Sequence, residues 1–150
     1  MKKNESIKVV KILFALYIVL VLFLCLYNFN SEEIKLPEKF LGIPVDKYIH
    51  FIMFYPFSFI CWIFFEYNTP IYSNKKYHFF RDYRFTTIIL LGVILASFTE
   101  AGQALLTLER SCDPLDLLAD FLAILAGSLT VYYSKKHIKR AFNIIFRVNL

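Results

Sequence analysis

Four long apolar segments limit what this chain can fold into. They cover about residues 9–29, 47–65, 85–106 and 115–133, and the first carries no charge after Lys11. A helix of about 20 apolar residues crosses the roughly 30 Å of hydrocarbon in a bilayer. The hydrophobic fraction of 58% also exceeds the roughly 45–50% of soluble domains. The sequence therefore predicts an all-α membrane protein, with four transmembrane helices in one domain over residues 1–150.

Charged residues outside these segments predict the orientation of the chain. Basic residues gather at the N-terminus, in the connector 66–84 and in the tail 134–150, whereas the connectors 28–45 and 107–114 are nearly balanced in charge. By the positive-inside rule, both termini should lie in the cytoplasm. We expect a multi-pass protein of the inner (cytoplasmic) membrane that contacts membrane lipids. Nucleic acid is not expected as a partner, because the chain contains no nucleic-acid-binding module.

Local signals refine this picture. Pro56 should bend the second helix, because proline lacks a backbone donor. The bulky residues before Cys25 offer no signal-peptide cleavage site, so the first helix should be retained. In the tail 134–150, apolar residues recur at helical spacing and predict an amphipathic helix along the inner leaflet. They are Ile138, Ala141, Phe142, Ile145 and Phe146.

Polar residues within the apolar segments are the best guide to function. Glu100 and Asp120 would each cost several kcal/mol if they faced lipid unpaired. In the predicted topology, both lie about 9 Å below the outer end of their helix, and His50 lies roughly 6 Å below it. Three helices therefore bring polar side chains to one layer near the outer face. The predicted ligand-binding residues are Asp46, Lys47, His50, Glu100, Gln103, Arg110, Asp113, Asp116 and Asp120.

This predicted pocket contains more carboxylates than cations. Either some carboxyl groups hold a proton, or a cation such as a divalent metal ion occupies the site. Arg110 is the best internal partner, because its planar guanidinium can bind a carboxylate through two hydrogen bonds. The candidate metal ligands are His50, Glu100, Asp116 and Asp120.

The same residues resemble the VanZ-like family, integral membrane proteins associated with resistance to the glycopeptide antibiotic teicoplanin. The resemblance covers about residues 46–127. It rests on D-K-x-x-H at Asp46, Lys47 and His50, E-x-x-Q at Glu100 and Gln103, Arg110 followed by Asp116, and a helix of small residues that ends at Gly127. The chain departs from the family at Asp120, where Asn is usual, and at Ala123, where Gly is common. The resemblance implies a membrane protein of the cell envelope.

Three classes of function remain open. A binding protein would engage a lipid-linked wall precursor or a glycopeptide at the outer leaflet. A small membrane enzyme would act on a lipid-linked or lipid head group, with His50 as base, Glu100 as acid or ligand and Arg110 as anion clamp. A transporter or proton relay is less favoured, because we expect no polar path through the inner halves of the helices. As a structural alternative, the cluster only fixes the register of the helices.

Overall fold

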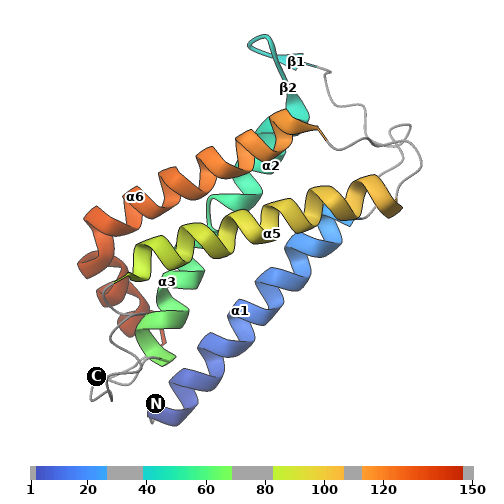
Figure 1. Cartoon of the computed structure of the whole chain (residues 1–150). Coiled ribbons are helices and arrows are strands. Elements are labelled where there is room, and N and C mark those ends of the chain that lie inside the picture. Colours follow the sequence, from blue (N-terminus) through green and yellow to red (C-terminus); the bar gives the residue numbers. More distant parts are fainter. Residues whose placement is uncertain (1–2, 27–38, 69–82, 107–112, 147–150) are drawn as a thin grey trace.

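The computed structural model describes residues 3–26, 39–68, 83–106 and 113–146 (Figure 1). Five helices and one short hairpin make up this part of the chain. The helices are α1 (Lys3–Leu26), α2 (Val45–Phe54), α3 (Phe57–Asn68), α5 (Arg84–Leu106) and α6 (Pro114–Ile145), and the strands are β1 (Lys39–Phe40) and β2 (Ile43–Pro44).

Four stretches of helix are long and apolar enough to cross a membrane, which confirms the predicted class of fold. They are Glu5–Leu26, Val45–Asn68, Arg84–Leu105 and Pro114–Ile145. Many of their apolar side chains point outward: Leu16, Ile52 and Phe98 are 61%, 69% and 62% exposed. Water would make such surfaces costly, whereas lipid would cover them favourably.

The second of these stretches is interrupted at Pro56, as the sequence predicts. α2 ends at Phe54, and the N–H of Tyr55 still donates to the carbonyl of Phe51 at 3.0 Å. Pro56 has no N–H to continue this pattern. Its carbonyl accepts from the N–H groups of Phe59 and Ile60, both at 3.1 Å, and so starts α3.

A small antiparallel hairpin precedes α2 and is an addition to the predicted all-α fold. Phe40 pairs with Ile43 across a turn in which Leu41 and Gly42 have φ angles of 51° and 81°. The Tyr48 hydroxyl donates to the carbonyl of Phe40 at 3.1 Å and fixes the hairpin against α2. Leu-Gly is not one of the dipeptides that usually signal such a turn, so the sequence alone does not predict it.

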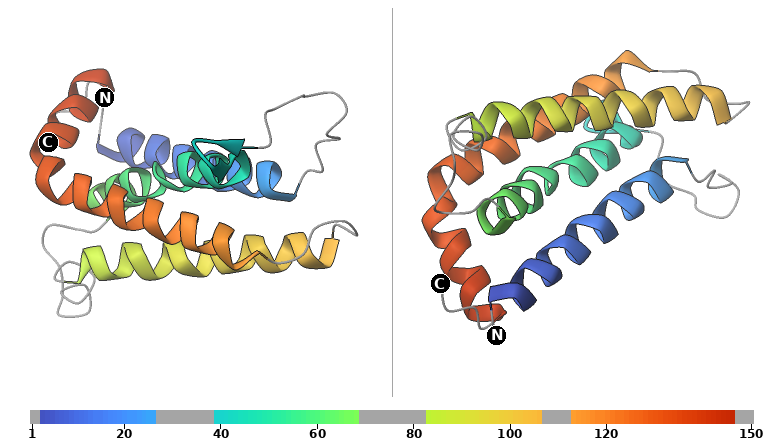
Figure 2. Two further views of the ribbon diagram at one scale, coloured as in Figure 1. Left: turned by 90° about the horizontal axis from the view of Figure 1, so that it is seen from above. Right: turned by 60° about the horizontal axis from the view of Figure 1, so that its bottom comes forward.

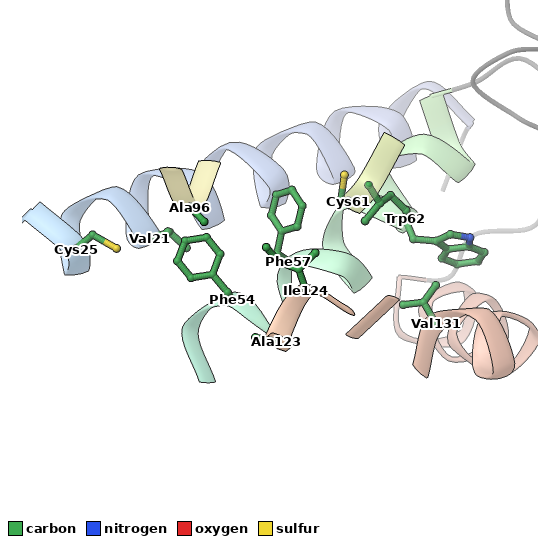
Figure 3. Packing of buried hydrophobic residues seen from close by; sticks show 11 residues of the cluster. Val21, Cys25, Phe54, Phe57, Cys61, Trp62, Ala96, Ala123, Ile124 and Val131 are labelled. Carbon is green, nitrogen blue, oxygen red and sulfur yellow. The ribbon is translucent and has the colours of Figure 1, made fainter. Parts of the chain in front are cut away.

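α6 packs against α2, α3 and α5, and α1 packs against α3 and α5. Figure 2 shows α3 between α1 and the α5–α6 pair. The core between them contains side chains from every helix (Figure 3). Its buried members are Val21, Cys25, Phe54, Phe57, Cys61, Trp62, Ile88, Ala96, Ala123, Ile124 and Val131.

Gly127 of α6 marks the closest approach between helices. A Cβ at this position would lie 2.5 Å from the carbonyl oxygen of Tyr55. Beside it, the Ser58 hydroxyl donates to the carbonyl of Ile124 at 3.0 Å and lies 3.1 Å from the Ser128 hydroxyl. The small residues that end at Gly127 in the sequence thus allow α6 to approach the α2–α3 break closely.

The tail does not form a separate helix in the described residues. α6 continues without a break to Ile145, and its C-terminal part turns away from its first part (Figure 2). Phe142 packs on Val10 and Tyr67, and the Tyr67 hydroxyl donates to Asn143. Part of the apolar face predicted for the leaflet therefore contacts the protein.

Candidate functional site

The candidate site lies where the first turns of α2, the C-terminal part of α5 and the first two turns of α6 meet. α2 contributes His50, α5 contributes Glu100 and α6 contributes Asp120. These side chains are almost completely buried, with exposed fractions of 7%, 2% and 0% for the three residues. We call these three residues the inner cluster.

One imidazole connects the two carboxyl groups of the inner cluster. Nδ1 of His50 lies 3.0 Å from Oδ1 of Asp120, within hydrogen-bond distance, and 3.8 Å from Oε1 of Glu100. One potential ligand atom from each of the three residues lies within 4.8 Å of the others. Three helices therefore present one nitrogen and two carboxyl groups to a single point.

Three oxygen atoms of the inner cluster have no hydrogen-bond partner in the described part of the chain. They are Oε1 and Oε2 of Glu100 and Oδ2 of Asp120. A buried carboxylate without a partner loses its hydration and gains nothing in return. These oxygens therefore need a proton, a cation, or a donor from a ligand or from a residue outside the described part of the chain.

A second set of charges, Asp46, Lys47, Asp113 and Asp116, lies beside the inner cluster and is called the outer cluster. The Nζ atom of Lys47 lies 3.0 Å from Asp46, 2.5 Å from Asp113 and 2.6 Å from Asp116. Lys47 is only 9% exposed. Its ammonium group therefore supplies the cation that three aspartates need.

Asp113 also determines where α6 begins. Its side chain accepts a hydrogen bond from the N–H of Leu115 at 2.9 Å, and Pro114 occupies the first turn. This arrangement is a common start of a helix. The hydrogen bond from Lys47, followed by that from Leu115, lowers the pKa of the Asp113 carboxyl group. Asp113 therefore joins the start of α6 to the start of α2.

The predicted convergence of three helices is confirmed for His50, Glu100 and Asp120, which lie together in the inner cluster. Asp46, Lys47, Asp113 and Asp116 form the neighbouring outer cluster. Gln103 is buried and donates to the carbonyl of Cys25 on α1 at 3.0 Å. Arg110 lies outside the described residues. The ligand-binding roles of all nine residues remain predictions.

Sequence reasoning missed two features of this region. It paired the carboxylates with Arg110, whereas the described residues use Lys47 for three of them. It also expected no polar path through the halves of the helices beyond the site, and it overlooked two pairs of hydroxyl groups there. Ser58 bonds Ser128, and the Tyr55 hydroxyl lies 3.0 Å from that of Thr130. The signal in the sequence was the presence of hydroxyl-bearing residues in both the second and the fourth apolar segments.

We compared the chain with models of protein families, with curated proteins and with solved structures, and no match was found.

Proposed function

We propose that this chain is a multi-pass protein of the cytoplasmic membrane that binds a component of the cell envelope, with a cation held by the inner cluster. The envelope component is a lipid-linked wall precursor or a glycopeptide. The observation that carries this proposal is the set of three buried carboxyl oxygens on Glu100 and Asp120 without a described hydrogen bond. Ionisable groups at such depth in a membrane protein generally serve function.

The donor set indicates the kind of cation. His50 offers an imidazole nitrogen, while Glu100 and Asp120 offer carboxylate oxygens. Mixed nitrogen and oxygen ligands suit Zn²⁺ and related transition metals, whereas Mg²⁺ and Ca²⁺ prefer oxygen alone. A divalent transition metal ion is therefore the proposed occupant. It would also supply positive charge toward an anionic head group.

The acidic character of both clusters restricts which ligands can bind. Lys47 is already paired with Asp46, Asp113 and Asp116, so it has little capacity left for an anion. A pyrophosphate of a lipid-linked precursor would need the bound cation as a bridge. A ligand with an ammonium group would bind the carboxylates directly. Arg110 is proposed as the anion clamp.

The orientation belongs to this proposal as well. Both termini would lie in the cytoplasm, with connectors 28–45 and 107–114 outside and the end of α6 at the inner leaflet. The basis is the distribution of basic residues. Labelling Leu41→Cys in a Cys112→Ser background tests it, because Leu41 is 84% exposed in the hairpin. A membrane-impermeant maleimide should label intact cells; labelling only after lysis overturns the orientation.

Metal analysis of the purified full-length protein tests the cation site. We expect about one divalent transition metal ion per chain, and loss of it in both His50→Ala and Glu100→Gln. Asp46→Asn is the matched control, because its side chain is 55% exposed and belongs to the outer cluster. A metal-free wild-type protein, or equal loss in the control, would exclude the cation site.

Binding to the envelope component needs a separate measurement. The full chain in lipid nanodiscs should bind a lipid-linked wall precursor or teicoplanin, and Glu100→Gln should weaken that binding at least tenfold. Glu5→Gln serves as the control, because Glu5 is an exposed carboxylate of α1 outside both clusters. If neither ligand binds, or if Glu100→Gln binds as well as the wild type, the proposed function is wrong even if metal is present.

One observation favours an enzyme as the second candidate. His50 is held by Asp120 at 3.0 Å, an arrangement in which a carboxylate orients an imidazole for proton transfer. Glu100 lies 3.8 Å from the same nitrogen and could supply a proton. The substrate would be a lipid or lipid-linked head group. In this case Glu100→Ala abolishes turnover but leaves affinity for the head group nearly unchanged.

A further inference from the structure

A second polar region lies at the opposite end of the helices, where α3 ends, α5 begins and the C-terminal part of α6 passes (Figure 1). These elements line an open pocket of about 400 Å³, within the usual size range of small-ligand sites. Its lining contains four basic side chains, Arg84, Lys135, Lys136 and Lys139, together with Glu66. Trp62 and Phe85 complete it. We call it the basic pocket.

Charges in the basic pocket are only partly neutralised. Glu66 forms an ion pair with Arg84, and the Nζ atom of Lys139 lies 2.7 Å from its other oxygen. Glu66 therefore fixes two of the four basic groups in place. Lys135 and Lys136 are exposed, and neither has a carboxylate partner among the residues that the structure describes. The pocket keeps an excess of positive charge that favours an anion.

The pocket lies at the ends of membrane-crossing helices. Glu66 is two residues from the end of α3 at Asn68, and Arg84 is the first residue of α5. The N-terminus of a helix carries partial positive charge and favours anions. Residues at the end of a transmembrane helix lie near the lipid head groups. The anion most available at this level is the phosphate of a lipid.

The walls of the pocket match a phospholipid in polarity. Trp62 is buried at 4% exposure, and Figure 3 shows it at the edge of the core beside Val131. The ring of Phe85 lies 5.3 Å from that of Tyr132. The ammonium group of Lys135 lies 5.2 Å from the same Tyr132 ring. Aromatic groups next to basic ones offer an apolar surface for the glycerol region and cations for the phosphate.

We infer that the basic pocket binds the phosphate head group of one anionic phospholipid. Lys135 and Lys136 attract the phosphate, while Arg84 and Lys139 are held at its edge by Glu66. Basic pockets between transmembrane helices are known to recognise anionic head groups in this way. The site is separate from the inner cluster and does not depend on the function proposed for it.

Native mass spectrometry of the full chain in detergent tests the inference. The probes are dioleoylphosphatidylglycerol and dioleoylphosphatidylcholine, which have the same acyl chains, and glycerol 3-phosphate as a soluble phosphate. We expect the wild type to prefer phosphatidylglycerol. The variant K135A/K136A should bind it about 30-fold more weakly, or about fivefold per lysine. K135R/K136R should retain binding, because it keeps both charges.

The matched control is K8A/K11A, which removes the same charge from two exposed lysines of α1. It should change the affinity for phosphatidylglycerol less than about twofold. Circular dichroism confirms that each variant keeps its helices.

Equal weakening by both pairs, or no preference over phosphatidylcholine, means that the basic residues attract lipid only through general charge. Displacement of the lipid by equimolar glycerol 3-phosphate would assign the site to a soluble phosphate. Each of these results overturns the inference.

Discussion

His50 and Asp120 lie 3.0 Å apart across α2 and α6, although they are 70 positions apart in the chain. Glu100 of α5 lies 3.8 Å from the same imidazole nitrogen, so three helices share one histidine. A single imidazole can form hydrogen bonds with only some of the oxygens of these two buried carboxyl groups. The properties of the site therefore depend on what else, proton or cation, these carboxyl groups hold.

Glu100→Gln should separate stability from cation binding. Without metal, we expect the variant to unfold at the same temperature as the wild type or higher, because it removes a buried charge whose oxygens accept no described hydrogen bond and whose ion-pair partner, His50, lies 3.8 Å away. Added Zn²⁺ should raise the unfolding midpoint of the wild type only. A ligand at about 100 times its Kd adds about 2.7 kcal/mol to the free energy of unfolding. Thermal unfolding with EDTA or Zn²⁺ measures both effects.

Asp120→Asn is the companion variant for this experiment. The amide oxygen can still accept a hydrogen bond from His50, so the contact between α2 and α6 is retained while the charge is lost. We expect a smaller response to Zn²⁺ with little change in the metal-free midpoint. If Glu100→Gln instead lowers the metal-free midpoint by more than about 5 °C, Glu100 is a structural partner and not a cation ligand.

Lys47→Met should destabilise the protein by leaving three aspartates without their shared cation. Breaking a buried ion pair costs about 3–5 kcal/mol. We expect about 3 kcal/mol here, because the Asp46 and Asp113 side chains are 55% and 38% exposed. Unfolding midpoints in detergent provide the measurement.

Calcium provides the internal check on this prediction. Potential ligand oxygens of Asp46, Asp113 and Asp116 lie within 4.8 Å of one another, and Ca²⁺ prefers carboxylate oxygens. Millimolar Ca²⁺ should therefore restore stability to Lys47→Met but leave the wild type unchanged. Lys47→Arg, which keeps the charge, should need no calcium. Equal stabilisation of wild type and variant by Ca²⁺ would show that Lys47 does not occupy the site.

The sequence predicts the fold well where a single physical signal dominates. Runs of about 20 apolar residues define the four membrane-length helices. The absence of a proline N–H places the break at Pro56. Helical rise within each helix, combined with the alternating direction of successive helices, brings His50, Glu100 and Asp120 to one layer. These inferences use local signals along each helix and the order of the helices, and none needs a specific contact between two helices.

Partners between distant segments are harder to predict. Lys47 follows Asp46 directly, but nothing in the sequence shows that it also pairs with Asp113 and Asp116, which lie 66 and 69 positions further on. A long side chain can reach several carboxylates, and the choice depends on how α2 and α6 cross. Sequence reasoning favours Arg110, because its planar guanidinium has the better geometry for a carboxylate in isolation.

The length of α6 shows the limit of hydropathy as a signal. Apolar character falls after Tyr133, so the sequence placed the end of the fourth span there. Charged residues such as Lys135 and Lys136 are nevertheless good helix formers, and no proline or glycine follows Gly127 to stop the helix. α6 therefore continues to Ile145.

Gly127→Ala should destabilise the packing of α6 against the break between α2 and α3. The added Cβ would lie 2.5 Å from the carbonyl oxygen of Tyr55, a backbone atom that cannot rotate away. Overpacking of this kind costs about 1–3 kcal/mol. Gly102→Ala is the control, because its Cβ would meet only the flexible end of Leu26 at 2.8 Å. Unfolding midpoints of the two variants should differ clearly; similar midpoints would mean that α6 shifts at little cost.

Asp113 gives a prediction for pH. Its pKa in the folded protein is lowered by the hydrogen bond from Lys47 and then by that from Leu115. A carboxylate with a lowered pKa stabilises the fold above its unfolded pKa of about 3.9, and this contribution is lost as the pH falls through the folded pKa.

Asp113→Asn keeps a good helix cap but not the charge. Wild type should therefore be more stable than Asp113→Asn at pH 7, and the difference should vanish at acidic pH. Unfolding midpoints of the wild type and Asp113→Asn, compared from pH 7 to pH 3, measure this difference. Asp113→Ala should lose a further ~1 kcal/mol at every pH, because the cap is gone. A wild-type advantage that stays constant down to pH 3 would show that the charge of Asp113 does not stabilise the fold through Lys47.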